Sequence, residues 1–183
     1  MNRTGNSNDK EVKKKPPVPL LVNNYDPKEI EQFINRYDYT EHYEPFVVNS
    51  KDSPCLFPRN KISGYVSDIP VRITVSGSRK GPYLYQCVYA DAYGVGSLLH
   101  VYQTKASKND KTVSHLCGNG NCCNADHLIV EEKGTNDIRT GHHHFLKIIA
   151  RRDISNYIEL YEKEKYMCEC DPPCGIIHRI NDL

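Results

Sequence analysis

Apolar residues recur at helical spacing in three parts of the chain, and capping residues mark a fourth, so four helices are predicted. The first begins with Asp26 as the N-cap and Pro27 as the first helical residue, an arrangement that suits a helix start. The second carries Cys87 on its apolar face, which assigns this thiol to the core. The third is brief, because Thr135 can cap it and Gly141 can end it. The predicted helices cover residues 27–37, 84–92, 135–141 and 148–161.

Shorter apolar runs predict strands. Apolar and polar residues alternate from Val71 to Val75, which is typical of a half-buried strand whose polar face can meet a ligand. The polar side chains of this strand belong to Arg72, Thr74 and Ser76. Residues 98–103 and 112–116 are interpreted as strands joined by a polar turn, and residues 128–130 as a further short strand. Helices and short strands together predict an α+β fold.

Composition limits the size of the core. The 183 residues are 38% hydrophobic and 26% charged, and they include four Phe and no Trp. This leaves room for one compact domain and a tail, with a modest core that needs an extra source of stability such as bound metal. We expect residues 1–22 to form a flexible basic tail and residues 23–183 a single zinc-bound domain, because the first segment is too polar to order itself.

Charge and hydropathy limit where the protein acts. The formal net charge of +1 offers no global argument for a polyanionic partner, so any such argument must come from local sites. Lys13, Lys14 and Lys15 are interpreted first as a solvated charge run, with phosphate contact or a nuclear address as the alternatives. No run of about 18 apolar residues is present, and the N-terminus lacks the apolar centre of a signal peptide. We expect an intracellular, nuclear protein with no membrane partner.

Cysteines and histidines gather in two short segments, which favours metal ligands, because disulfides would leave the histidines unexplained. In the first segment Cys117, Cys122 and His127 are five residues apart and supply three of the four ligands of a structural zinc site. Cys55 is our choice for the fourth, because it follows a turn-forming sequence outside any periodic element. Cys123 is expected to point away if Cys122 binds. A chance cluster of buried thiols is the alternative.

The second segment holds a complete set of ligands by itself. Pro172 and Pro173 provide the turn that brings these ligands together. A loose C-terminal tail with reactive thiols is the alternative. The predicted ligands are Cys168, Cys170, Cys174 and His178, so we expect two structural zinc ions per chain.

A more specific pattern surrounds the first cluster. The run from Ser114 to Leu128, SHLCGNGNCCNADHL, closely resembles the His-Cys box of intron-encoded homing endonucleases. The resemblance extends over about residues 55–178 and implies a small zinc-stabilised ββα-metal (His-Me finger) fold. It also implies that His115 is a general base and that Asn136, nine residues beyond His127, holds a catalytic Mg²⁺.

The chemistry of these residues agrees with the roles that the resemblance implies. A histidine beside a zinc tetrahedron, but outside it, is rigidly placed and can take a proton from water near neutral pH. A carboxamide oxygen binds zinc poorly but suits Mg²⁺, which stabilises the charge on a scissile phosphate. The alternatives are a structural strand histidine at His115 and a helix-start cap at Asn136.

The resemblance further implies double-stranded DNA as substrate, an arginine near the scissile phosphate, and a homodimer. Candidate DNA contacts are Arg72, Thr74, Arg79 and, one helical turn from Asn136, Arg139. The three histidines at 142–144 are expected to face solvent or to interact favourably with a helix C-terminus.

We therefore expect a Mg²⁺-dependent endodeoxyribonuclease. One alternative is a zinc-dependent module that binds nucleic acid without cleaving it, against which the presence of both His115 and Asn136 argues. The other is a structural zinc protein that engages another protein through its tyrosine-rich surface, and an absence of salt-sensitive DNA affinity would favour that alternative.

Overall fold

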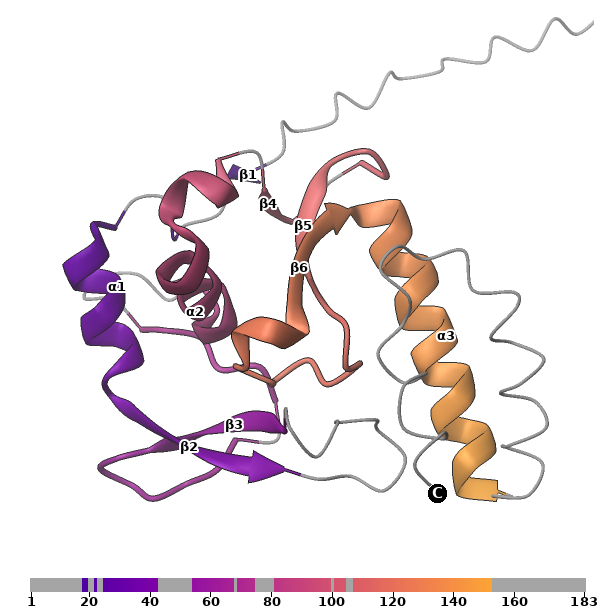
Figure 1. Ribbon diagram of the computed structural model, residues 1–183, viewed down its shortest axis with the longest axis horizontal. Coiled ribbons are helices and arrows are strands. Elements are labelled where there is room, and N and C mark those ends of the chain that lie inside the picture. The colour runs from indigo at the N-terminus through magenta and orange to yellow at the C-terminus, as the bar shows by residue number, and fades with distance from the viewer. Residues whose placement is uncertain are drawn as a thin grey trace, which may run out of the picture.

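The computed structural model describes residues 18–19, 22, 25–42, 54–67, 69–74, 81–99, 101–104 and 107–152 (Figure 1). Over these residues the chain has a mixed α+β fold of three α-helices and three two-stranded antiparallel sheets, which confirms the predicted fold class. Several predictions lie outside the described residues. They concern Arg79, the helix beyond residue 152, and the second ligand set of Cys168, Cys170, Cys174 and His178.

Helix α1 (Pro27–Ile34) begins as predicted and ends three residues early. The Asp26 carboxylate accepts a 2.9 Å hydrogen bond from the Glu29 amide, and the Glu29 carboxylate accepts one of 3.0 Å from the Asp26 amide. This reciprocal capping box satisfies two backbone donors at the helix start. The cap is local in sequence, which explains why the start of α1 was predictable.

The chain leaves α1 to form a hairpin that periodicity did not predict. Strand β2 (Tyr37–His42) pairs antiparallel with β3 (Cys55–Asn60), with Tyr37 opposite Asn60 and His42 opposite Cys55. Cys55 therefore begins a strand, and its predicted position outside regular structure was wrong. Residues 55–60 contain Pro58 and show no alternation of apolar and polar residues, so the local pattern does not indicate a strand.

Helix α2 (Leu84–Tyr93) confirms the second predicted helix and packs beside α1 (Figure 1). The strand predicted over residues 71–75 is reduced, among the described residues, to one antiparallel bridge between Arg72 and Tyr83. The segment packs very closely against the start of α2. A Cβ on Gly81 would lie 1.6 Å from the Ile73 carbonyl oxygen, so only glycine permits this approach.

A second hairpin and a long helix form the other half of the fold. Strands β5 (Lys111–His115) and β6 (Leu128–Glu132) pair antiparallel, as predicted for these segments, with His115 opposite Leu128. The chain then passes directly from β6 into α3 (Lys133–Arg152), which lies on the right in Figure 1. This ββα order agrees with the fold that the resemblance implied.

Two further predictions about this half were wrong. The helix predicted to end at Gly141 continues without a break to Arg152, since a glycine inside a helix costs only about 1 kcal/mol and neighbouring turns can sustain it. The strand predicted over residues 98–103 is instead a 3₁₀ turn, η2 (Val95–Leu98), followed by the short strand β4 (Tyr102–Thr104). Strand β4 pairs with β1 (Val18–Pro19).

The core lies between α1, α2 and the β5–β6 hairpin. Val22 is fully buried in this core, and β1 begins at Val18. The folded region thus includes residues that the sequence assigned to the tail. In the part of the chain that the structure describes, no helix is long and apolar enough to cross a membrane. The buried core residues include Val22, Ile30, Phe33, Ile73, Leu84, Cys87, Leu98, Val101, Val113 and Leu128.

Candidate metal centre and active site

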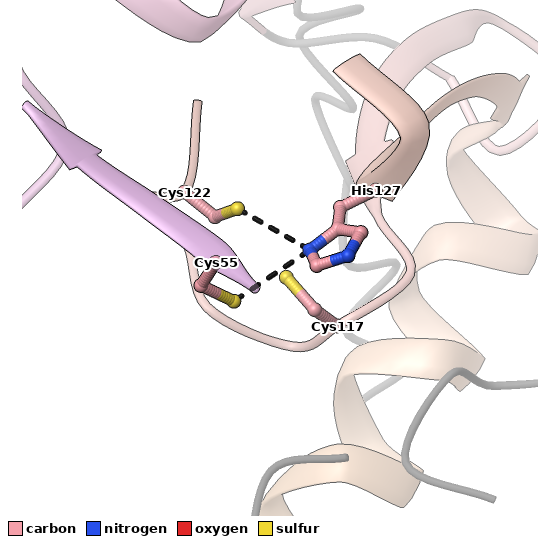
Figure 2. Close-up of side chains that lie close together, drawn as sticks. All are labelled: Cys55, Cys117, Cys122 and His127. Carbon is pink, nitrogen blue, oxygen red and sulfur yellow. Dashed lines mark hydrogen bonds between the residues drawn. The ribbon is translucent and has the colours of Figure 1, made fainter. Parts of the chain in front are cut away.

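Four side chains from separate parts of the chain meet at one point (Figure 2). Cys55 comes from the start of β3, Cys117 and Cys122 come from the loop after β5, and His127 comes from the 3₁₀ turn η3 (Ala125–His127). Their sulfur and nitrogen atoms all lie within 4.8 Å of one another. The structure therefore brings together the four ligands predicted for the first zinc site.

The spacing of these atoms fits tetrahedral zinc. In a tetrahedron with zinc–sulfur bonds of about 2.3 Å and zinc–nitrogen bonds of about 2.0 Å, a sulfur ligand and a nitrogen ligand lie about 3.5 Å apart. The Nδ1 atom of His127 lies 3.6 Å from the Cys55 sulfur and 3.5 Å from the Cys122 sulfur. Three buried thiols and one imidazole thus form a Cys₃His cluster that fits zinc. In the described part of the chain, no other group of three or more His, Cys, Asp or Glu residues is close enough together to hold a metal ion.

The electrostatics of the cluster are those of a charged Cys/His site. Burial lowers the pKa of His127, but its hydrogen bonds with Cys122 and Cys55 outweigh burial and raise that pKa to about 10. Hydrogen bonds from the Cys117 and Cys122 thiols lower the pKa of Cys55 far below its ordinary value. Burial raises the pKa of Cys117 well above its ordinary value. The protein alone therefore stabilises one thiolate in this site. Zinc binds thiolates, and its charge would stabilise all three.

Backbone and amide contacts fasten the zinc loop to β3. The side-chain Nδ2 of Asn119 donates to the Cys55 sulfur over 3.3 Å. The side-chain Nδ2 of Asn124 donates to the Pro54 carbonyl oxygen over 2.8 Å. The Cys123 backbone amide donates to the carbonyl oxygen of Leu56 over 2.8 Å. The Cys123 side chain belongs to the hydrophobic core, as predicted, and so does that of Cys87.

His115 and Asn136 line one pocket of about 270 Å³. His115 is the last residue of β5, and Asn136 is the fourth residue of α3. The helix begins at Lys133, so Asn136 is not a cap, and that alternative is excluded. The other residues that line the pocket are Gly118, Gly120, Thr140, His143 and His144.

The imidazole of His115 is oriented by the zinc loop. Its Nε2 atom lies 3.2 Å from the Cys122 carbonyl oxygen, which can only accept a hydrogen bond. A neutral ring therefore carries its proton on Nε2 and a lone pair on Nδ1. Burial lowers the pKa of His115 to about 4, so the neutral ring predominates at pH 7. The ring of Tyr85 packs edge-to-face on this imidazole with centroids 4.6 Å apart.

The side-chain oxygen of Asn136 is also oriented. The Ser114 hydroxyl donates to Asn136 Oδ1 over 2.8 Å, and the Thr140 hydroxyl lies 3.5 Å from the same oxygen. One amide oxygen in a pocket fits Mg²⁺, an ion that usually keeps several waters and shares its remaining positions with substrate phosphate.

The predicted DNA contacts have different surroundings. The Arg72 guanidinium lies over the Tyr83 ring, 4.4 Å from the centroid, and donates to the Tyr83 hydroxyl over 3.1 Å. Thr74 is exposed. Arg139 is 1% exposed and forms a bidentate pair with Glu131, with donor–acceptor distances of 3.0 and 2.7 Å. A guanidinium buried in this way cannot reach a phosphate, so the assignment of Arg139 to DNA contact was wrong.

His143 also departs from the sequence prediction, because it is buried rather than solvent-facing. Its ring packs against Gly118, where an added Cβ would lie 2.7 Å from the His143 Nδ1 atom. Asn136, Thr140 and His143 follow the i, i+4, i+7 spacing of one helix face. This spacing signals a common face only if the helix continues past Gly141, which the prediction did not assume.

Comparison with known proteins agrees with this geometry. The family model described as the zinc-binding loop region of homing endonuclease matches residues 53–182. No curated protein and no solved structure matches the chain. The match spans most of the chain, and it contains all four Cys₃His residues together with His115 and Asn136. The chain therefore belongs to the His-Me finger family of homing endonucleases that carry this zinc-binding loop.

Proposed function

We propose that this protein is a Mg²⁺-dependent endonuclease that hydrolyses phosphodiester bonds in double-stranded DNA. The observation that carries the proposal is the pocket that His115 and Asn136 line together with Gly118 and Gly120 of the loop that carries Cys117 and Cys122. Membership of a homing endonuclease family supports nuclease activity and a DNA substrate.

His115 is the general base of this reaction. Its Nδ1 lone pair takes a proton from the water that attacks phosphorus, while Nε2–H donates to the Cys122 carbonyl oxygen. The imidazolium that forms is stabilised by the same carbonyl, because the hydrogen bond becomes stronger when the donor is charged. The ring needs no rotation between the two states, since the carbonyl and Tyr85 hold it from two sides.

Asn136 holds the catalytic metal through Oδ1. Bound Mg²⁺ would stabilise the negative charge that develops on the scissile phosphate and on the departing 3′ oxygen. Asn136 is suited to this task, because its oxygen is neutral, is oriented by Ser114, and opens into the same pocket as His115.

Arg72 is our candidate for the arginine that contacts phosphate. Tyr83 stacks on Tyr85 with centroids 5.3 Å apart, and Tyr85 packs on His115. The guanidinium, which lies over Tyr83, is thereby connected to the general base through two aromatic rings. Thr74 and Arg79 remain proposed DNA contacts on the same segment.

The remaining assignments are proposals from the sequence. We propose a second structural zinc ion, a homodimer, and a nuclear location for the protein. The ligands of the second zinc ion would be Cys168, Cys170, Cys174 and His178.

A plasmid-nicking assay tests the function. The parent protein is expected to convert supercoiled DNA to nicked or linear DNA with Mg²⁺ and to leave it intact with EDTA. His115→Ala should be inactive, whereas His142→Ala should match the parent, because His142 lies on the same helix but does not line the pocket. An inactive parent, or an active His115→Ala variant, would refute the proposal.

A further inference from the structure

We propose that Ser114 is a positioning residue that orients the Asn136 amide for metal binding. The inference rests on the proposed function, because it assumes that Asn136 Oδ1 is a metal ligand. The observation behind it is a 2.8 Å hydrogen bond from the Ser114 hydroxyl to Asn136 Oδ1, which joins β5 to α3.

Burial makes this hydrogen bond persistent. Ser114 is 1% exposed, so its hydroxyl has little opportunity to exchange its acceptor for bulk water. With the amide reversed, the Ser114 oxygen could accept a hydrogen bond from Asn136 Nδ2, but the buried O–H group would lose its acceptor. The cost of that unpaired donor favours the conformers in which Asn136 presents its oxygen to Ser114. A residue at the same place without a hydroxyl would remove that preference.

The hydrogen bond fixes the terminal torsion of the Asn136 side chain. The buried ion pair between Glu131 and Arg139 already ties α3 to β6 one helical turn from Asn136. The terminal torsion of an asparagine is broad and nearly twofold, so a fixed backbone does not decide whether oxygen or nitrogen faces a ligand. Ser114 selects one of these two orientations.

A carboxamide oxygen has two lone pairs, which allows both contacts at once. Donation by Ser114 occupies one of them, and a divalent cation would take the second in place of the longer contact from the Thr140 hydroxyl. Thr140 contributes less to the orientation, because its hydroxyl is 3.5 Å from Oδ1 and the residue is exposed. Strand β5 therefore carries two adjacent functional residues, the general base His115 and the residue that orients the metal ligand.

Manganese binding tests this role without relying on cleavage. Mn²⁺ is titrated into zinc-loaded protein bound to a mixed-sequence DNA duplex, and free Mn²⁺ is followed by electron paramagnetic resonance. Ser114→Ala should weaken Mn²⁺ binding about 3- to 10-fold, the effect expected of one hydrogen bond. Ser114→Thr should restore binding. Thr112→Val, which removes a hydroxyl from the same strand, should leave Mn²⁺ affinity and zinc content unchanged.

A double-mutant cycle separates positioning from general stabilisation. If Ser114 acts through Asn136, the Ser114→Ala change should have no further effect on Mn²⁺ binding in an Asn136→Ala background. Parental Mn²⁺ affinity in Ser114→Ala, loss of zinc from that variant, or additive effects in the double variant would each overturn the proposal. Parental affinity in Asn136→Ala would overturn it as well.

Nicking assays on the same samples distinguish the two proposals. A parent protein that binds Mn²⁺ through Asn136 and Ser114 but does not nick DNA would refute the proposed function and leave the positioning role intact. If the parent nicks DNA while Ser114→Ala keeps parental Mn²⁺ affinity, the positioning role is refuted and the proposed function stands.

Discussion

The Nε2 atom of His115 lies 3.2 Å from the backbone carbonyl oxygen of Cys122, a ligand in the Cys₃His cluster. Through this contact the zinc loop orients the residue that we propose as the general base. Zinc bound to the cluster would therefore do more than stabilise a small core, because the position of the Cys122 carbonyl depends on the position of its side chain. Four predictions follow from this arrangement and from the contacts around it.

Removal of zinc is expected to unfold the domain rather than only to inactivate it. Structural zinc sites contribute on the order of 10 kcal/mol of apparent binding free energy, which is comparable to the entire stability of a small domain. Circular dichroism during titration with a strong chelator should show loss of helix together with loss of zinc. Helical content that stays constant after zinc has been removed would contradict the structural role.

Cys55→Ser should lower the zinc content by one ion per chain and destabilise the fold, and metal analysis with thermal unfolding would measure both effects. Cys87→Ala is the matched control, because Cys87 is equally buried but lies in the hydrophobic core. We expect this control to keep its zinc and to lose only about 1–2 kcal/mol through a small cavity. Equal zinc content in both variants would remove Cys55 from the ligand set.

His115→Ala and Asn136→Ala should both abolish cleavage, with losses on the order of 10²- to 10⁴-fold expected for the lost base, while zinc content and DNA binding stay near the parental values. The two variants should differ in what restores activity. His115→Ala should recover partly at high pH, where hydroxide replaces the lost base, and Asn136→Ala should recover with raised Mg²⁺. Initial nicking rates over a grid of pH and Mg²⁺ would show this difference, and identical responses would argue against separate roles.

Arg139→Met should destabilise the protein by about 3–5 kcal/mol, because it leaves the Glu131 carboxylate buried without its partner. The double variant Glu131→Met, Arg139→Met should recover much of that loss, since it removes both charges. Urea unfolding would measure the stabilities. The salt dependence of DNA binding should be unchanged in the double variant, because a buried Arg139 releases no counterions from DNA. A shallower salt dependence of DNA binding in the double variant would show that Arg139 contacts DNA.

The parts of the fold that were predictable from sequence are those whose causes are local. Asp26 and Pro27 start α1 through contacts within one turn, and α2 follows from one apolar face. Cys117, Cys122 and His127 were identifiable as ligands because their spacing within one loop already limits how far apart they can lie. Local patterns also indicated Ser114 to Leu128 as the central motif, which the structure builds as strand, loop, turn and strand.

Tertiary structure decided the features that depend on distant partners. Cys55 was chosen as the fourth ligand for the wrong reason, because it begins strand β3, which pairs with β2, and does not lie outside regular structure. Arg139 was assigned to DNA because a sequence pattern does not show that Glu131 lies beneath it when α3 follows β6 directly. His143 was assigned to solvent because the helix was predicted to end at Gly141, whereas α3 continues to Arg152 and His143 is buried against Gly118. In each case the deciding free energy comes from burial and from contacts between separate helices, strands and loops, which the pattern of a single element does not show.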